Sequence, residues 1–260
     1  MDLILALFAV AVAAGFIDSI AGGGGLLTVP ALALAGFDPL TAVATNKLQG
    51  SFGSGSATLA FARAGRIDLK TMWPIAVAAM SGALIGAFTL TYIPRDAATI
   101  ALPFLLAAVA LYFLLSPRIS DLDVHQRMPR PWFIATIVPL VGFYDGVFGP
   151  GAGSFYTIGF VSLLGFGLLK ATAHTKLANF ASNIAGLLVL ALSGHIVWGV
   201  GIAMGVGQFV GARIGVWMTI RHGTRLVRPL LITVCCVLAI RLSIAPTHPI
   251  GAWLLAHGMF

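Results

Sequence analysis

The chain has 260 residues, of which 59% are hydrophobic and only 9% are charged. Soluble domains carry about 25% charged and about 45–50% apolar residues, so this chain could not cover a water-exposed surface with polar groups. Its mean hydropathy of +1.00 agrees. We therefore exclude a soluble globular protein and expect an all-α polytopic membrane protein, because helices satisfy their own backbone hydrogen bonds within a bilayer.

The formal net charge of +7 does not indicate a nucleic-acid partner. The Lys and Arg residues lie mostly between apolar segments, where the retention of positive charge in the cytoplasm explains them. No basic patch is interleaved with stacking aromatic residues. The cysteines, Cys235 and Cys236, are adjacent within an apolar run, which predicts packing residues and neither a disulfide framework nor a metal site. We expect no cofactor.

Apolar segments long enough to cross a bilayer follow one another along the chain. A helix needs about 20 apolar residues to span the hydrocarbon core. The chain turns apolar directly after Met1-Asp2, without a basic region, which favours a retained segment over a signal peptide. The most polar stretch, residues 116–131, leaves no room for a soluble domain. The further predicted spans are residues 48–62, 71–94, 97–115, 177–194, 196–220 and 226–240.

The second half of the chain repeats the first. Residues 15–18 (Gly-Phe-Ile-Asp) return as residues 142–145 (Gly-Phe-Tyr-Asp), and a cluster of glycines follows each. Because order and spacing are kept over more than 100 residues, we predict two transmembrane repeats, residues 1–118 and 131–260, joined by a loop at 119–130. The later matches are 45–48 with 174–177, 65–67 with 194–196, and 82–86 with 211–215.

The basic residues favour an inverted relation between the two repeats. If every apolar segment crosses the membrane, the twelve Lys and Arg outside it divide seven to five between the faces. If the glycine-containing segment of each half is a re-entrant hairpin, they divide ten to two, as the positive-inside rule requires. The first arms of these hairpins, residues 3–17 and 131–144, are also shorter than a full crossing.

We therefore expect about eight membrane segments in a cell inner membrane, with the basic loops in the cytoplasm and both termini in the periplasm. Arms extended through their Asp could just reach across, so full crossings are the alternative. Arg95 and Arg241 are assigned to the periplasmic face. The cytoplasmic face receives Arg63, Arg66, Lys70, Arg118, Arg127, Arg130, Lys170, Arg221, Arg225 and Arg228.

The two glycine clusters predict the centre of a binding site. Glycines allow a ligand to approach the backbone closely, and the free N–H groups at the start of a half-helix favour an anion. Broken helices that meet at the midplane recur in transporters built from inverted repeats. The alternative is that the glycines only permit tight packing. The candidate residues are Gly22, Gly23, Gly24, Gly25, Gly149, Gly151 and Gly153.

Two acids and two lysines occupy equivalent positions in the repeats. Asp18 and Asp145 lie inside apolar runs, where an ionisable side chain is costly and indicates function. They either brace the glycine breaks by accepting backbone N–H bonds or carry a coupling proton or sodium ion. Lys47 and Lys176 lie at the mouth of the next predicted helix in each half. They bind an anionic substrate, snorkel to the interface, or pair with Asp18 or Asp145.

Polar residues near the lysines add hydrogen-bonding groups to this candidate site. His174 stands where the first repeat has Thr45 and could titrate near neutral pH, although a polar cap explains it equally well. Arg213, between Gly211 and Gly215, is either an anion contact or a partner for an aspartate. Asn46 and Thr175 are predicted to bind the substrate. The remaining candidates, which either line a cavity or join helices by hydrogen bonds, are Gln49, Asn179 and Asn183.

These residues resemble the TauE/SafE family of sulfite-exporter-like permeases over about residues 15–228. The resemblance implies an inner-membrane carrier for sulfur-containing or related organic anions, such as sulfite, sulfoacetate, sulfonates or thiosulfate. It does not identify the anion, the direction of transport, the coupling ion or the oligomeric state. The segments that carry it are residues 15–18, 21–25, 45–47, 142–146, 148–153, 174–176 and 211–213.

The predicted function is a secondary transporter that moves small anions across the lipid bilayer by alternating access around a central site. An anion channel is the first alternative, because glycine-rich breaks suit a pore equally well. An intramembrane aspartyl protease is the second, but its chemistry needs an Asp directly after a Gly-x-Gly, where this chain has Ser154. We therefore expect no enzyme, and the absence of an ATP-binding motif predicts no ATP-driven pump within this chain.

Overall fold

The computed structural model describes residues 2–93 and 123–222, and every regular element in these ranges is a helix. The predicted spans 97–115 and 226–240 lie outside the described residues, as do both cysteines and Arg95, Arg118, Arg225, Arg228 and Arg241. The helices are α1 (Asp2–Ala21), α2 (Gly24–Leu34), α3 (Pro39–Arg63), α4 (Leu69–Leu90), α6 (Arg130–Ala135), α7 (Ile137–Val147), α8 (Ala152–Ser162), α9 (Leu168–Leu192) and α10 (Trp198–His222).

Four described helices are long and apolar enough to cross a membrane, namely α1 (over Asp2–Ile20), α4, α9 and α10 (over Trp198–Arg221). α1 is longer than the arm predicted at residues 3–17, so the expectation that this arm is too short to cross is wrong. The helix continues through Asp18 to Ala21, and the carboxylate of Asp18 is paired there with the ammonium of Lys176. α3 also has 25 residues, but it carries buried polar side chains along much of its length.

The start of α3 shows why the lysines lie deeper than the sequence suggests. Asp38 caps the helix by accepting a hydrogen bond from the N–H of Thr41, and Pro39 occupies the first turn, where a missing N–H costs nothing. Lys47 therefore lies more than two turns inside α3. Lys176 has the corresponding place in α9, which begins at Leu168. The prediction that these lysines lie at the mouths of their helices is wrong.

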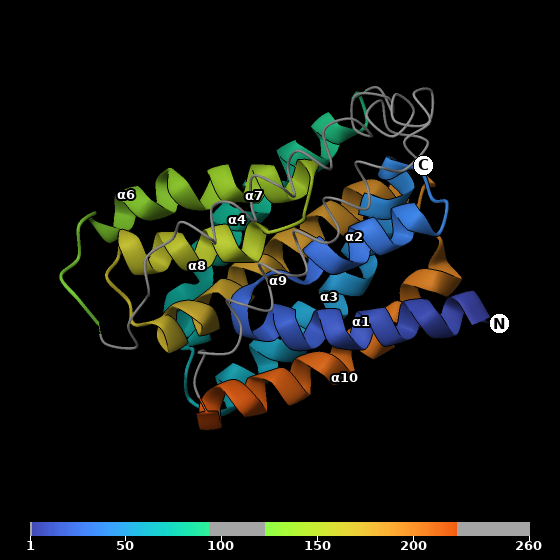
Figure 1. Cartoon of the computed structure of the whole chain (residues 1–260). Helices are drawn as coiled ribbons and strands as arrows, with labels where there is room; N and C mark the ends of the chain where they lie inside the picture. The colour runs from blue at the N-terminus through green and yellow to red at the C-terminus, as the bar shows by residue number, and fades with distance from the viewer. Residues whose placement is uncertain (1, 94–122, 223–260) are drawn as a thin grey trace, which may run out of the picture.

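Each half contains a helical hairpin that is broken at glycine. α1 runs inward, the chain turns at Gly22 with a φ of +80°, and α2 returns toward the end of the molecule where α1 begins (Figure 1). α6 and α7 run inward from the opposite end, and α8 returns to that end after Gly149 and Gly151, whose φ angles are +88° and +82°. The positive φ favours glycine at these turns, because a side chain would strain the backbone there.

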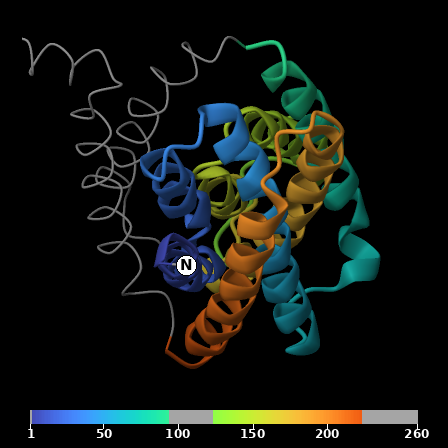
Figure 2. The same ribbon diagram turned by 90° about the vertical axis from the view of Figure 1, so that its right-hand side faces the viewer.

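The two halves interlock through close backbone contacts. α10 lies beside α1, whereas α4 lies on the other side of the bundle against α7 (Figure 2). Small residues make this possible, because a Cβ atom on Gly82 would lie 2.0 Å from the carbonyl oxygen of Pro139 and one on Gly211 would lie 2.0 Å from that of Val12. Gly82 and Gly211 are equivalent in the repeat. α4 of the first half therefore packs on the hairpin of the second half in the same way that α10 packs on the hairpin of the first half.

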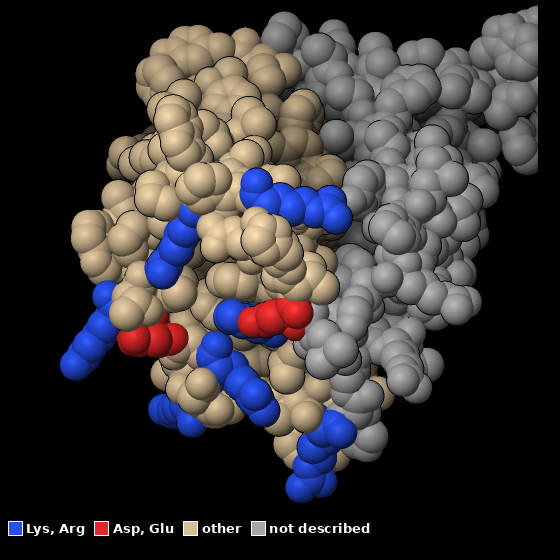
Figure 3. Space-filling view, turned by 90° about the vertical axis from the view of Figure 1, so that its left-hand side faces the viewer, with Lys and Arg blue, Asp and Glu red and all other residues tan. Residues whose placement is uncertain are grey.

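Basic side chains gather at one end of the molecule (Figure 3). At this end α3 leads into α4, α6 begins, α8 leads into α9 and α10 ends (Figure 1). Asp123 accepts hydrogen bonds here from the N–H of Gly167 and the ammonium of Lys170, and the Gly167 bond is the main reason that the pKa of this exposed carboxyl lies below its usual value. The described basic residues of these segments are Arg63, Arg66, Lys70, Arg127, Arg130, Lys170 and Arg221.

Candidate functional site

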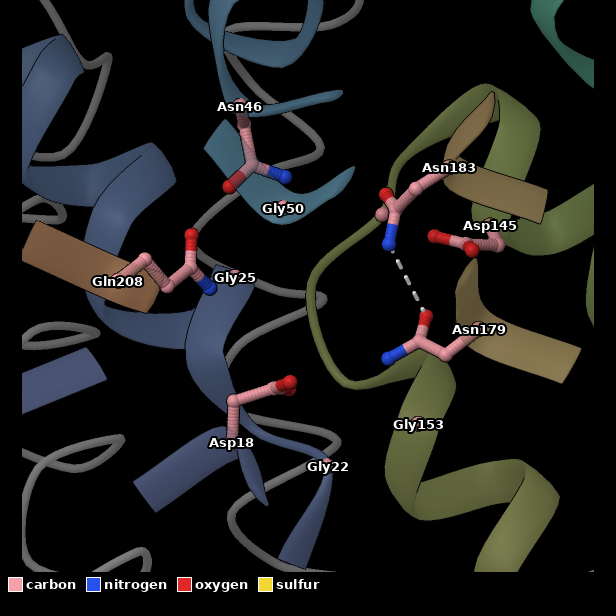
Figure 4. Close-up of a pocket in the computed structure, with 11 residues that line it drawn as sticks. Asp18, Gly22, Gly25, Asn46, Gly50, Asp145, Gly153, Asn179, Asn183 and Gln208 are labelled. Atoms are coloured by element: carbon pink, nitrogen blue, oxygen red, sulfur yellow. Dashed lines mark hydrogen bonds between the residues drawn. The ribbon is translucent and has the colours of Figure 1, made fainter. Parts of the chain in front are cut away.

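A small polar cavity lies where the two hairpin turns meet, with α3, α9 and α10 around it (Figure 4). Its volume is about 20 Å³, room for one water-sized molecule, so a larger ligand requires the site to open. No aliphatic or aromatic side chain is among its lining residues. They are Asp18, Gly22, Gly25, Asn46, Gly50, Asp145, Gly149, Gly153, Asn179, Asn183 and Gln208.

Nine of these eleven residues are candidates from the sequence, and Gly50 and Gln208 are not. The hairpin turns bring the two glycine clusters into contact, because a Cβ atom on Gly22 would lie 2.3 Å from the carbonyl carbon of Gly153. The remaining candidates do not line this cavity. They are Gly23, Gly24, Thr45, Lys47, Gln49, Gly151, His174, Thr175, Lys176 and Arg213.

The buried lysines form ion pairs that cross between the halves. The ammonium of Lys47 lies 2.6 Å from a carboxylate oxygen of Asp145, and that of Lys176 lies 3.0 Å from one of Asp18. Each ammonium also donates to the backbone carbonyl of the same aspartate. Both lysine side chains are fully buried, so each charge is matched where an unpaired one would be very costly. Of the roles predicted for the lysines, the ion pair is the one present.

Asp18 also holds its hairpin turn in place, whereas Asp145 bonds a long helix. The second carboxylate oxygen of Asp18 accepts a hydrogen bond of 3.1 Å from the N–H of Gly24, the first residue of α2. Its backbone carbonyl accepts from the N–H of Gly22 at 2.8 Å. The second oxygen of Asp145 instead accepts from the hydroxyl of Ser182 on α9. Asp18 thus spans its glycine break directly, as the bracing role requires.

The first turns of α2 and α8 both begin at the cavity. Their N-cap residues, Gly23 and Gly151, provide no side-chain hydrogen bond to the helix, and Gly25 and Gly153 in these turns line the cavity. The N–H groups of a first helical turn have no partner within the helix, and the helix dipole places partial positive charge there. The cavity therefore lies between two positive helix ends.

Hydrogen bonds to neighbouring side chains orient Asn46, one of the lining amides. Its oxygen accepts from the hydroxyl of Thr28 at 2.7 Å and from the amide of Gln49 at 2.9 Å. A Cβ atom on Gly149 would lie 3.4 Å from its amide nitrogen. This places the NH₂ group of Asn46, a hydrogen-bond donor, toward the glycines of the second hairpin.

α9 contributes two further lining amides, Asn179 and Asn183. It also makes a contact with α8 that matches the one between Asn46 and Thr28 in the first half. Asn183 donates to Asn179 at 3.4 Å, one turn away on α9 (Figure 4). The hydroxyls of Thr157 and Thr175 lie 3.1 Å apart, in the places that Thr28 and Asn46 hold in the first half. Thr175 is thus a second-half counterpart of Asn46 that braces α8 and does not line the cavity.

Gln208 on α10 is one of the two lining residues that reasoning from the sequence missed. Its side chain is only 2% exposed, and its amide oxygen has no hydrogen-bond partner among the described residues. A signal was present, because an amide inside the apolar run 196–220 needs a polar partner in a membrane. The missed Gly50 makes room for Asn183, whose amide lies 3.1 Å from where a Cβ atom on Gly50 would be.

Three other candidates lie away from the cavity. His174 bonds through Nδ1 to the carbonyl of Lys170 and packs against the ring of Phe166, so it belongs to the packing near the basic end. The hydroxyl of Thr45 accepts from the N–H of Val197 at 3.2 Å. Arg213 lies over the ring of Phe209 and has no ion pair within residues 2–93 and 123–222. Among the described residues, Arg213 therefore makes neither of the two contacts predicted for it, one with an anion at the cavity or one with an aspartate.

The family model for the sulfite exporter TauE/SafE matches residues 7–242 of this chain. The chain belongs to the TauE/SafE family. Among its relatives is the probable membrane transporter protein ORF9 of a Sinorhizobium species, which is 53% identical over 248 residues covering 95% of each chain. No solved structure matches the sequence.

Two further relatives of this TauE/SafE protein have the same kind of name. The probable membrane transporter protein YfcA of Escherichia coli strain K12 is 48% identical, covering 91% of this chain and 88% of its own. A probable membrane transporter protein of Haemophilus influenzae is 43% identical, covering 89% and 91%. The chain is therefore a multi-pass membrane protein of a transporter family.

Proposed function

We propose that this TauE/SafE protein is a secondary transporter of small anions, in particular sulfur-containing ones such as sulfite, sulfoacetate and sulfonates. The observation that carries the proposal is the meeting of the first turns of α2 and α8 at one buried polar cavity, into which the unpaired amide of Gln208 opens. Helix N-termini attract anions, and the unpaired amide oxygen of Gln208 needs a hydrogen-bond donor, which a protonated oxyanion such as hydrogensulfite supplies.

The charges around the cavity support an anion over a cation. Asp18 and Asp145 are acidic, but each has its own lysine within 3.0 Å, so the four charges cancel. The two helix N-termini then add partial positive charge. Amide NH₂ groups such as that of Asn46 provide donors without a formal charge. An oxyanion placed here would accept hydrogen bonds from both hairpins at once.

We infer alternating access because the two hairpins enter from opposite ends (Figure 1), which supports the inverted relation of the repeats predicted from the sequence. The cavity is too small for sulfite, so the resting site is closed and must open to one side at a time. The cross-half ion pairs are the contacts that such an opening would loosen, and protonation or sodium binding at Asp18 or Asp145 would couple it to an ion gradient. We place the basic end in the cytoplasm, across a cell inner membrane from the N-terminal end.

The ion pairs and the volume of the cavity also bear on the two alternative functions, an aspartyl protease and an anion channel. An aspartyl protease shares one proton between two carboxyl groups, whereas each aspartate here faces its own ammonium group. A channel would need a continuous path, and the cavity here has a volume of only about 20 Å³, one water molecule in size. A closed channel would look the same, so a flux measurement must separate it from a carrier.

Radiolabelled sulfite uptake into proteoliposomes tests the proposal. A carrier gives saturable uptake that unlabelled sulfite on the opposite side accelerates. Uptake that rises linearly with sulfite and shows no such acceleration would favour the channel. If sulfite, sulfoacetate and thiosulfate all fail to bind or cross, the proposed anion site is wrong. Protein-free liposomes give the background flux.

A further inference from the structure

We propose that Gln208 is a specificity-determining residue that contacts the transported anion directly through its amide. The inference rests on the proposed function, since it assigns a role within the same cavity. Gln208 comes from α10, which is not part of either hairpin. Its contribution is therefore separate from that of the glycine turns and the ion pairs.

The first argument is the unmet hydrogen-bonding capacity of this side chain. Gln208 is 98% buried, since its exposed fraction is 2%, and its amide oxygen has no partner in the described part of the chain. The other lining amides differ, because Asn46 accepts two side-chain bonds and Asn183 donates to Asn179. Leaving a buried acceptor unpaired is unfavourable. A bound oxyanion that carries a proton, such as hydrogensulfite, would donate its O–H to this oxygen while its other oxygens accept from the NH₂ group.

The second argument is the space that surrounding glycines leave for this side chain. A Cβ atom on Gly53 of α3 would lie 2.6 Å from Cγ of Gln208, and one on Gly24 of α2 would lie 3.0 Å from its amide nitrogen. A Cβ atom on Gly15 of α1 would lie 2.3 Å from its backbone oxygen. α2 and α3 thus lack side chains where the side chain of Gln208 passes, so that its amide reaches the cavity, whereas Gly15 lets the backbone of α10 pack closely on α1.

The third argument comes from the internal repeat, which offers a built-in comparison. Ala79 precedes Gly82 as Gln208 precedes Gly211, and its backbone oxygen meets Gly142 as that of Gln208 meets Gly15. The backbone packing is therefore shared, but only the second half carries an amide. Gly53, which makes room for Gln208, has Ser182 on α9 as its counterpart in the second half. The hydroxyl of Ser182 donates to Asp145, so no amide is accommodated there.

The asymmetry separates two tasks within the site. The aspartates, lysines and turn glycines occur in both halves and form the framework. The amide of Gln208 occurs once, so it can distinguish ligands without altering the framework. An amide offers both a donor and an acceptor, which suits a protonated oxyanion that presents an O–H group beside its charged oxygens.

Calorimetric titration of sulfite into the full chain in detergent tests this role. Gln208→Met keeps the length of the side chain and removes the amide, and we expect sulfite affinity to fall about tenfold or more, as for a lost hydrogen bond to a charged group. Gln208→Glu keeps the shape and adds a negative charge, and we expect a larger loss. Thr219→Val is the matched control, because Thr219 is buried on the same helix, bonds only within it and does not line the cavity.

Each outcome decides the proposal. Sulfite affinity within threefold of wild type in folded, monodisperse Gln208→Met and Gln208→Glu would overturn the role of Gln208 and leave the anion transporter standing. An equal loss in Thr219→Val would show that the effect is not local to the cavity, which also overturns it. If wild type binds none of sulfite, sulfoacetate and thiosulfate, the proposed function fails and this inference fails with it. Should Gln208→Met not fold, the isosteric Gln208→Glu carries the test.

Discussion

Lys47 of α3 and Asp145 of α7 form a buried ion pair of 2.6 Å between residues from opposite halves of the chain. The repeat-equivalent pair of Lys176 and Asp18 crosses the other way, at 3.0 Å. Each lysine also bonds the backbone carbonyl near the end of a broken helix, where the helix dipole is negative. Two reciprocal contacts therefore fix each hairpin to the long helix of the opposite half.

Removing one partner of these pairs should destabilise the protein strongly. Lys47→Met leaves Asp145 buried without its cation, and we expect a loss of about 3–5 kcal/mol in the free energy of unfolding. The double variant Lys47→Met with Asp145→Asn should recover much of this. Unfolding in mixed micelles measures both. Lys170→Met is the control, since its pair with Asp123 is about half exposed and should change stability by at most about 1 kcal/mol.

The same lysine variants test the anion role that the sequence also allowed. Because the ammonium groups do not line the cavity, folded Lys176→Met should bind sulfite less tightly only to the extent that the hairpin shifts. Calorimetric titration of sulfite into the folded fraction measures the affinity separately from any loss of folded protein. A complete loss of binding in protein of wild-type stability would show that the ammonium contacts the anion after all.

Gly22→Ala should disrupt the meeting of the hairpins. The residue has a φ of +80°, and its new Cβ atom would lie 2.3 Å from the backbone of Gly153. Strain and overlap together should cost about 2–5 kcal/mol and abolish sulfite transport. Gly36→Ala separates the two causes, because Gly36 has a φ of +91° with nothing within 4 Å. It should cost only about 1–2 kcal/mol; equal effects of the two changes would show that the contact with Gly153 is unimportant.

The contact between α10 and α1 should tolerate no side chain at Gly211. A Cβ atom there would lie 2.0 Å from the carbonyl oxygen of Val12, so Gly211→Val should lower stability by about 3 kcal/mol or more. Gly199→Val on the same helix, where nothing lies within 4 Å, should change it by less than about 0.5 kcal/mol. Thermal unfolding compares them, and a stable Gly211→Val protein would contradict this packing.

The basic end should face the cytoplasm. In a chain whose Cys235 and Cys236 are changed to Ser, Arg66→Cys between α3 and α4 should react with a membrane-impermeant maleimide only after cells are permeabilised. Tyr92→Cys, exposed beyond the other end of α4, should react in intact cells. The reverse pattern would invert the proposed orientation.

The sequence predicted the membrane class, the repeat and most of the cavity lining, because these depend on local properties of the chain. Composition alone decides that a bilayer must cover the surface, and the repeat aligns Asp18 with Asp145 by position. The glycines at 22, 149 and 151 indicate breaks because few other residues accept a positive φ. Nine of the eleven lining residues could therefore be named without a structure.

Only the tertiary structure decided which groups meet. Lys47 was equally compatible with an anion and with either aspartate, and its pairing with Asp145 depends on how α3 of one half passes the hairpin of the other. Gln208 gave a weak signal because its place in the cavity depends on glycines of other helices, Gly24 on α2 and Gly53 on α3. Contacts between distant segments depend on the packing of the whole bundle, and a linear pattern of residue types carries no record of that geometry.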